Sequence, residues 1–174
     1  VLDFTPDASV QDTIATGLAP ALAAIRAVAQ PVLSVARGKL SATACTLVRS
    51  ADLILAANDA SLIVPISETE DDTLTGAQAA RLGYVTWATP PNDLRKEMER
   101  ILDMLRGSSA IALCHTKASV RLATTGKDTN TPKTPLEALQ EINSFYLEEV
   151  MHTADAHEGL QAFLEKRKPN WKNS

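Results

Sequence analysis

Aromatic residues are scarce in this chain of 174 residues, where phenylalanine, tryptophan and tyrosine together make up 4%. Hydrophobic residues still account for 45%, which suits one globular domain with an aliphatic core rather than a disordered or fibrous protein. Long apolar runs are missing as well. The most apolar stretches, 53–57 and 62–65, are far shorter than the roughly 20 residues that span a bilayer. We therefore expect no transmembrane helix and no membrane partner.

Cysteines are few, and basic residues are fewer than acidic ones. The two cysteines, Cys45 and Cys114, lie in apolar neighbourhoods, so we expect buried reduced thiols in a cytoplasmic protein. The 17 Lys and Arg are outnumbered by 21 Asp and Glu, which gives a formal net charge of -4. Binding to nucleic acid needs a clustered excess of basic residues, so we expect no nucleic-acid partner. The N-terminus, which begins at Val1, shows no charged region followed by an apolar one, and we predict no secretory signal.

Helix-like and strand-like segments alternate in the first half of the chain. Apolar residues at steps of three and four predict a helix over residues 8–29, which Pro31 ends. Gly38 ends the first of the predicted strands and precedes a small-residue helix. The short apolar runs that predict buried strands are 31–36, 51–57 and 61–65. This alternation predicts an α/β fold.

The second half is predicted to be mainly helical. Residues 67–72 hold four acids among six and predict a solvated connection. Thr75 is expected to cap a helix that Gly83 ends, a strand is expected over 84–88, and Asn92 is expected to cap the next helix. The remaining predicted helices cover 109–122, 136–151 and 155–166.

Three segments together resemble the crotonase (enoyl-CoA hydratase/isomerase) superfamily. The first, 30–65, has a Pro-led strand, a glycine turn, a short helix, an Asp-led strand and a strand that ends in proline. The second, 75–85, is similar to the family's helix-glycine-strand element, and the helix pair that follows is matched by 94–117. The third, Thr153 to Pro169, is similar to the family's closing helix almost residue for residue.

The resemblance implies a crotonase-like (ClpP/crotonase) α/β spiral core with a C-terminal helical trimerisation region. We expect a partial core over residues 1–108, without the family's N-terminal strands, and a helical region over 109–174. A homotrimer or hexamer is the implied assembly. Where the family has a loop and helix after the strand-ending proline, this chain has only residues 67–72, so the resemblance is to a divergent and truncated member.

The resemblance also implies a thioester site. Family members hold the thioester carbonyl with two backbone N–H groups that stabilise an enolate. Thr43 N–H is the expected first donor, although a side chain stands there in place of the family's middle glycine, and the second donor is expected to lie before Val1. Thr46 and Ile66 occupy the positions of the two glutamates of hydratases, and neither side chain acts as a base near neutral pH.

Two functional hypotheses follow. In the first, the protein binds an acyl-CoA or acyl-carrier-protein thioester and works as a lyase or isomerase, by decarboxylation or isomerisation rather than hydration. Loss of carbon dioxide forms the enolate without a base, so an oxyanion pocket and one proton donor suffice. In the second, the protein is a catalytically silent structural or assembly subunit, which the missing glutamates favour. A helical partner-binding module is a third idea, and it requires the match in the closing helix to be chance.

The candidate catalytic residues are Thr43, Thr46 and His152. Thr43 and Thr46 form a hydroxyl cluster with Ser41, and such hydroxyls either position a ligand or bond their own backbone. His152 is a candidate general acid, and the alternative is a surface histidine. We predict no metal site. Two histidines five residues apart do not lie on the same face of a helix, and no third ligand appears at a suitable spacing.

The candidate coenzyme-binding residues are Lys166, Lys39 and Trp171. Cations bind phosphates and an aromatic face packs against adenine, but a solvated helix C-terminus and an exposed turn lysine are the alternatives. The resemblance favours Lys166, because the matching lysine of the family lies near the bound nucleotide. Coenzyme A or phosphopantetheine is expected as part of the substrate, and no permanently bound cofactor is expected.

Overall fold

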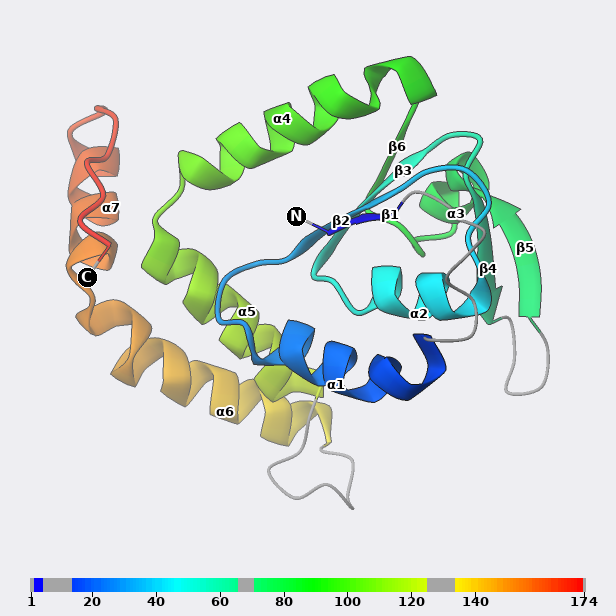
Figure 1. The fold of residues 1–174 in the computed structure, drawn as a ribbon. Helices are drawn as coiled ribbons and strands as arrows, with labels where there is room; N and C mark the ends of the chain where they lie inside the picture. The colour runs from blue at the N-terminus through cyan, green and yellow to red at the C-terminus, as the bar shows by residue number, and fades with distance from the viewer. Residues whose placement is uncertain (1, 5–13, 66–70, 125–133, 174) are drawn as a thin grey trace. The chain divides into compact units, whose positions relative to one another are not determined.

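The structure is a computed structural model that describes residues 2–4, 14–65, 71–124 and 134–173 (Figure 1). The chain forms two compact units, Val1–Leu102 and Asp103–Ser174. The first unit mixes strands and helices. Its elements are β1 (Leu2–Phe4), α1 (Ile14–Ala27), β2 (Leu33–Ala36), α2 (Ala42–Arg49), β3 (Leu53–Ala57), β4 (Ser61–Pro65), β5 (Asp71–Thr75), α3 (Gly76–Arg81), β6 (Trp87–Thr89), the 3-10 turn η1 (Pro91–Asp93) and the first part of α4 (Leu94–Arg106).

A parallel sheet is the centre of the first unit, with the strand order β1-β2-β3-β6. Leu33 is paired with Leu53 and Ala36 with Ala56, so β2 and β3 run side by side over four residues. Every residue of β2 is buried, as expected for a parallel strand that is covered on both faces. The strands predicted at 31–36 and 51–57 are therefore confirmed, and β4, predicted at 61–65, pairs with β5 in a separate antiparallel ribbon.

The two faces of the sheet are covered by different helices. Ser34 and Ala36 point towards α2, because the Ser34 hydroxyl donates to Val48 O at 3.1 Å and Ala36 belongs to a buried cluster with Val48. Successive residues of a strand alternate in direction, so Val35 points to the opposite face. There it lines a cavity together with Leu94 of α4. The short helix α2 is thus packed on one face of the sheet and α4 borders the other.

Helix α3 begins with a capping box. The Thr75 hydroxyl accepts the Gln78 N–H at 3.2 Å, and the Gln78 side chain accepts the Thr75 N–H at 2.9 Å. Gly76 follows because no other residue fits there, since a Cβ atom would collide with the Ala57 carbonyl. Gly83, at φ 81°, ends the helix in the left-handed conformation that glycine adopts without strain. The predicted cap and the predicted stop are both confirmed.

The second unit is helical. It contains the end of α4, then α5 (Ala110–Thr124), α6 (Pro135–Glu148), the 3-10 turn η2 (Val150–His152) and α7 (Ala154–Leu164). A second capping box, between Thr134 and Glu137, begins α6, and Pro135 occupies its first position. His115 of α5 and Phe145 of α6 meet edge to face with their ring centroids 5.4 Å apart. The three helices predicted in this region are confirmed with shifted ends.

Four details of the predicted elements need correction. The predicted helix over 8–29 is described only as α1, which ends at Ala27, and residues 8–13 lie outside the described residues. Asn92 does not cap α4 but lies inside η1. The strand predicted over 84–88 is shorter and begins later, as β6, and just before it the Thr86 side chain accepts the Ile54 N–H at 3.0 Å in place of a backbone carbonyl.

The fourth correction concerns the acidic connection. Residues 67–70 lie outside the described residues, but Asp71 and Asp72 belong to β5 and pair with Pro65 and Val64. The residues of β5 are largely exposed, so no alternation of apolar and polar residues marks this strand in the sequence.

A strand is also present at the N-terminal end of the described chain, where none was expected. β1 pairs in parallel with β2, with Leu2 opposite Ser34. The boundary expected after residue 108 stays a prediction, and the two compact units of the structure meet at Leu102 and Asp103.

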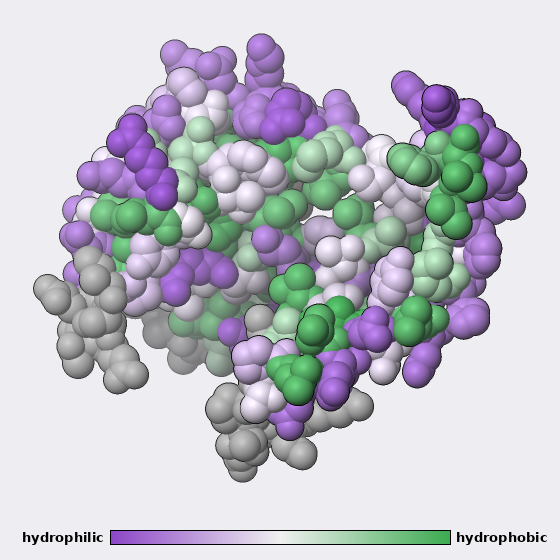
Figure 2. Space-filling view, turned by 180° about the vertical axis from the view of Figure 1, so that it is seen from behind, coloured by the Kyte–Doolittle hydropathy of each residue, from purple (hydrophilic) through white to green (hydrophobic). Residues whose placement is uncertain are grey.

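The surface of the second unit carries several large apolar side chains. Figure 2 shows hydrophobic residues exposed between hydrophilic ones on one face of the molecule. The exposed large hydrophobic residues of α6 and α7 are Leu136, Leu139, Tyr146, Leu147, Leu160, Phe163 and Leu164. Among the described helices, none combines the length and the apolar character needed to cross a bilayer.

Candidate functional site

The turn that leads from β2 into α2 is held in place by β4. Gly38 has φ 64°, its carbonyl accepts the Ser61 N–H at 2.8 Å, and the Leu40 N–H donates to Ser61 O at 3.0 Å. Lys39 lies between these bonds with an exposed side chain. The turn therefore fixes the direction in which α2 begins and places Lys39 at the surface beside that beginning.

One backbone N–H in the first turn of α2 is capped by a side chain. Ser41 is extended, with φ -72° and ψ 164°, and its hydroxyl accepts the Ala44 N–H at 3.2 Å. The Cys45 N–H donates to Ser41 O at 2.9 Å. Ala42 and Thr43 come before the first residue whose N–H has an acceptor within the helix. The structure gives neither N–H an acceptor among the described residues, so both remain open to a ligand.

Most hydroxyl groups of the cluster predicted at the start of α2 form hydrogen bonds with the backbone of that helix. Ser41 acts as the cap, and the Thr46 hydroxyl donates to Ala42 O at 3.0 Å from an exposed position. Thr43 is half-buried. Two of the three hydroxyls thus follow the local-backbone alternative, and the chemistry left at this turn is that of backbone N–H groups.

Cys45 belongs to the core rather than to this turn. Its sulfur accepts the Ile63 N–H at 3.2 Å, and burial raises the pKa of the thiol above its ordinary value despite that hydrogen bond and the nearby Arg49. A thiol with a raised pKa is a poor nucleophile at neutral pH. The side chain therefore serves packing between α2 and β4.

A cavity of about 440 Å³ lies in the first unit on the face of the sheet opposite α2. Val35 and Ala57 contribute apolar atoms from the sheet, and Arg95 and Glu99 contribute charges of both signs from α4. Thr43, Thr46 and Lys39 are not among its lining residues. Gly38, in the turn that leads into α2, does line it, so the cavity borders this turn without reaching the three candidate residues.

In the second unit, α7 ends in a Schellman motif centred on Lys166. The Arg167 N–H donates to Ala162 O at 3.0 Å and the Lys166 N–H donates to Phe163 O at 3.2 Å. Lys166 has φ 55°, a conformation in which glycine is the usual residue. Its side chain is exposed. The chain thus adopts a left-handed turn at a lysine, which costs of order 1 kcal/mol.

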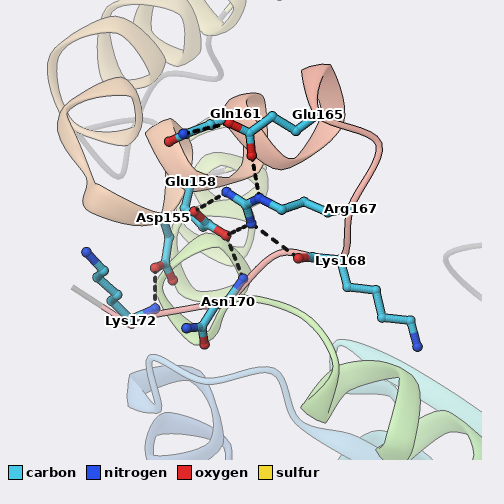
Figure 3. A network of polar contacts seen from close by, with 8 residues as sticks. All are labelled: Asp155, Glu158, Gln161, Glu165, Arg167, Lys168, Asn170 and Lys172. Atoms are coloured by element: carbon cyan, nitrogen blue, oxygen red, sulfur yellow. Dashed lines mark hydrogen bonds and ion pairs between the residues drawn. The ribbon is translucent and has the colours of Figure 1, made fainter.

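The segment that follows, residues 166–173, folds back along α7, and we call it the C-terminal strap. Glu158 of α7 holds its first half (Figure 3). The carboxylate accepts two bonds from the Arg167 guanidinium, at 2.6 and 3.0 Å, and the Asn170 N–H at 2.6 Å. The Arg167 guanidinium and the Asn170 N–H lower the pKa of Glu158 to about 2. Glu158 is therefore ionised at any ordinary pH, and the strap is bound to a permanent negative charge.

Asp155 holds the second half of the strap. This carboxylate is 2% exposed, and it accepts the backbone N–H groups of Lys172 and Asn173 and the hydroxyl of Ser109, the last at 2.5 Å. Burial opposes ionisation, but these hydrogen bonds outweigh it and hold the pKa of Asp155 below its ordinary value. Asn173 in turn accepts the Ala110 N–H at 2.9 Å and caps α5. The strap thereby connects α7 to the start of α5.

Trp171 is part of the same connection. Its indole N–H donates to Gly107 O at 2.9 Å, and its ring lies over Gly159, where an added Cβ would be 3.4 Å from the ring. The side chain is half-buried. Its predicted stacking on adenine stays a prediction, and the structure gives Trp171 a role in anchoring the strap.

The two histidines near α7 are at the surface. His152 is exposed and lies in η2, and His157 is exposed with Nδ1 3.0 Å from Thr153 O. Among the described residues, no three His, Cys, Asp or Glu side chains are grouped as metal ligands.

The structure sorts the six candidate residues into two groups. Lys39, Thr43 and Thr46 surround the start of α2 in the first unit, and Lys166 and Trp171 belong to the strap of the second unit, with His152 just before α7. The sequence reasoning missed the roles of Asp155 and Glu158 in holding the strap. Their spacing of three, with a basic run after the helix, is the signal that the sequence offers, and it does not identify which groups the two carboxylates bind.

Comparisons with known proteins agree on one family. The family model for enoyl-CoA hydratase/isomerase matches residues 70–174. Cyclohexa-1,5-dienecarbonyl-CoA hydratase of Thauera aromatica is 54% identical over 37 residues, which are 21% of this chain and 14% of that protein.

Solved structures show the same fold. The structure of an enoyl-CoA hydratase from Mycobacterium smegmatis has a TM-score of 0.74 at 22% identity, with 96% of this chain and 72% of that chain covered. An enoyl-CoA hydratase/isomerase from Mycobacterium paratuberculosis has a TM-score of 0.70 at 22% identity, with 86% of this chain and 66% of that chain covered. The chain thus matches only a part of the length of these relatives.

Proposed function

The chain belongs to the enoyl-CoA hydratase/isomerase family and has the crotonase fold, and from this premise we propose that it binds an acyl-CoA or acyl-carrier thioester and stabilises its enolate. The observation that carries the proposal is the first turn of α2. Its Ala42 and Thr43 N–H groups have no acceptor among the described residues, and they stand at the positive end of a helix. Donors fixed in this way stabilise an oxyanion without reorganisation.

The proposed reaction is decarboxylation or isomerisation rather than hydration. Thr46 stands where the hydratases of the family carry a glutamate, and its hydroxyl is bonded to its own helix and does not titrate near neutral pH. Ile66, at the other position, has no group to exchange a proton and lies outside the described residues. In a decarboxylation the bond to the carboxylate breaks, its electron pair forms the enolate, and one proton then adds to carbon. His152 is the proposed donor of that proton.

The coenzyme part of the substrate is proposed to contact Lys166, Lys39 and Trp171, with no permanently bound cofactor. The exposed side chains of Lys39 and Lys166 support a phosphate contact, and neither has a carboxylate partner among the described residues. For Trp171 the support is the resemblance alone, because the structure already engages its indole N–H.

We further propose a homotrimer or hexamer. The exposed apolar side chains of α6 and α7, such as Leu139, Leu147 and Phe163, support an assembly because large apolar side chains are otherwise rarely left in water together. Sedimentation velocity at several concentrations tests this. A species of one chain at micromolar concentration contradicts it.

The second candidate function is a catalytically silent subunit. The half-buried Thr43 side chain and the engaged Thr46 hydroxyl favour it, because a Cβ at position 43 narrows the approach of a thioester. This hypothesis predicts that the protein binds neither coenzyme A nor pantetheine.

A pair of proline substitutions tests the proposal. Thr43→Pro removes the proposed oxyanion donor, and Ala42→Pro removes the N–H one residue earlier. Both positions are in the first turn, where proline is tolerated. If Thr43 N–H is the donor, we expect Thr43→Pro to lower turnover of a 2-carboxyacyl-CoA such as malonyl-CoA by about 10²- to 10³-fold. Ala42→Pro should keep most of the turnover, and mass spectrometry of the CoA products measures both.

Each result decides between the hypotheses. Titration calorimetry that shows no binding of coenzyme A or pantetheine to the unmodified chain supports the silent subunit. Turnover that survives Thr43→Pro contradicts the role of α2 as the oxyanion site.

A further inference from the structure

Three consecutive cations follow α7, namely Lys166, Arg167 and Lys168, and they differ in whether they form ion pairs. Arg167 is bound by two carboxylates, those of Glu158 and Glu165, with the shortest bond to each at 2.6 Å. Lys166 and Lys168 are exposed, and neither has a carboxylate partner among the described residues. In Figure 3 the Lys168 side chain extends away from the network that holds Arg167. The middle cation therefore forms ion pairs within the protein, whereas the side chains of the outer two are exposed to solvent.

Glu158 also fixes the backbone that carries these lysines. The same carboxylate that binds the Arg167 guanidinium accepts the Asn170 N–H, so one side chain of α7 closes the strap on both sides of Lys168. The Arg167 guanidinium also donates to the Lys168 carbonyl at 3.3 Å. Because Lys166 adopts a left-handed conformation that lysine does not favour, its turn requires such external support.

We propose that Glu158 and Arg167 are positioning residues for coenzyme binding: their ion pair holds the strap so that Lys166 and Lys168 present their ammonium groups to the phosphates of a coenzyme. This inference rests on the proposed function and adds to it two residues that touch no ligand. It also assigns Lys168 to the phosphate contact.

The charge of Glu158 allows two explanations of its role to be separated by experiment. A carboxylate close to a phosphate site repels the ligand, so a purely electrostatic view predicts tighter coenzyme binding when Glu158 loses its charge. Positioning predicts the opposite. With glutamine at this position the guanidinium loses its bidentate partner, the strap loosens, and Arg167 is released. The sign of the change in affinity separates the two views.

Glu165 provides a matched control. It binds the same guanidinium through Nε, but its other contact is the Gln161 side chain on its own helix, and no strap backbone N–H donates to it. Glu165→Gln therefore removes the same charge from the same neighbourhood and leaves the strap closed by Glu158. We expect it to bind coenzyme A as well as the unmodified chain, or better.

The experiment is titration calorimetry of the full chain and of Glu158→Gln, Glu165→Gln, Lys166→Met and the Glu158→Gln, Lys166→Met double variant. Coenzyme A is one ligand, and pantetheine, which has no phosphate, is the other. We expect Glu158→Gln and Lys166→Met each to weaken coenzyme A binding about tenfold, the size of one lost charge-assisted hydrogen bond. Pantetheine affinity should not change. The double variant should be weaker than Lys166→Met by less than tenfold, because part of what Glu158 positions is already lost with Lys166 and only the Lys168 contact remains to be weakened.

The outcomes are distinguishable. If Glu158→Gln binds coenzyme A as tightly as the unmodified chain while Lys166→Met does not, the positioning role is wrong and the proposed function stands. Weakening of both ligands by the same factor in Glu158→Gln indicates a structural role only, which also overturns the inference. Full affinity in Lys166→Met removes the phosphate contact on which the inference depends. If the unmodified chain binds neither ligand, the proposed function itself is wrong.

Discussion

The start of α2 and the C-terminal strap differ in whether their backbone N–H groups have hydrogen-bond acceptors. At α2, Ser41 caps the Ala44 N–H, while Ala42 and Thr43 keep donors with no acceptor among the described residues. In the strap, Asp155 and Glu158 between them accept the backbone N–H groups of three strap residues. Open donors at an exposed helix start are available to a ligand, whereas satisfied donors stabilise the fold. The backbone of the strap is thus held by carboxylates of its own unit, whereas the first turn of α2 keeps two donors that the proposed function uses.

The family match follows the same division. The enoyl-CoA hydratase/isomerase model covers residues 70–174, which include the whole strap and exclude α2. The matched range thus contains the carboxylates that hold the strap. Residues 42–44 and Thr46, which by the resemblance stand in place of the family's glycines and a glutamate, lie outside the matched range.

Removal of the Asp155 carboxylate is the most severe test of the strap as a structural element. Asp155→Ala leaves the Ser109 hydroxyl and two backbone N–H groups without their acceptor in a site that is 2% exposed. We expect the free energy of unfolding to fall by about 3 kcal/mol. Urea unfolding measures it.

Asp103→Ala is the control for that experiment. Asp103 pairs with Arg106 at the surface of the same unit, at 3.0 Å and with 74% of its side chain exposed, so its loss should cost no more than about 0.5 kcal/mol. Equal losses in the two variants would mean that the strap contributes no more than a surface ion pair.

Acid should weaken the strap before it affects α2. The folded-state pKa of Glu158 is about 2, below the ordinary 4.5, so its contribution is complete above pH 4.5 and is lost as the pH falls towards 2. The lowered pKa of Asp155 adds a loss of the same sign. We expect the urea midpoint to fall over this range. Glu158→Gln should show a smaller fall, and an identical pH profile in that variant would contradict the assignment.

The strands and caps were predictable because each leaves a local pattern. Leu33 to Ala36 is a mainly apolar run in which Ser34 is the one polar residue, as is typical of buried parallel strands, and Thr75 and Gly83 are the residue types that begin and end helices. β5 was missed because its exposed residues show no alternation, and Asn92 was wrongly chosen as a cap because the 3-10 turn η1 comes before α4.

The site was predictable only in part. The position of Thr43 came from the resemblance, and the structure adds that its N–H lies in the open first turn of α2. The pairing of Glu158 with Arg167, nine residues away, was not predictable, because it depends on how the chain reverses at Lys166. No local pattern marks a lysine that adopts a left-handed conformation, since glycine is the residue expected there.

Loss of the α2 cap should have a smaller effect on stability than loss of Asp155. Ser41→Ala removes the acceptor of the Ala44 N–H and should cost about 1 kcal/mol, while Ser41→Gly should cost only a few tenths. Thermal unfolding of the two variants measures the difference. Coenzyme A affinity should persist in both, because the proposed donors at α2 are those that Ser41 does not cap. A loss of affinity in Ser41→Ala alone would mean that the cap itself shapes the site.

The smallest expected change is a gain in stability. Lys166→Gly relieves the left-handed strain at φ 55°, and we expect the free energy of unfolding to rise by about 0.5 kcal/mol, since part of the relief is offset by the greater freedom of glycine in the unfolded chain. Lys168→Gly is the control. Among the described residues, positive φ outside glycine occurs only at Lys166 and Asn173, so glycine at position 168 relieves nothing and should be slightly destabilising. If Lys166→Gly is stabilising and also weakens coenzyme A binding, the lysine is retained at the expense of stability because its ammonium group is needed. A stabilised variant with unchanged affinity would place Lys166 with the purely structural residues of the strap.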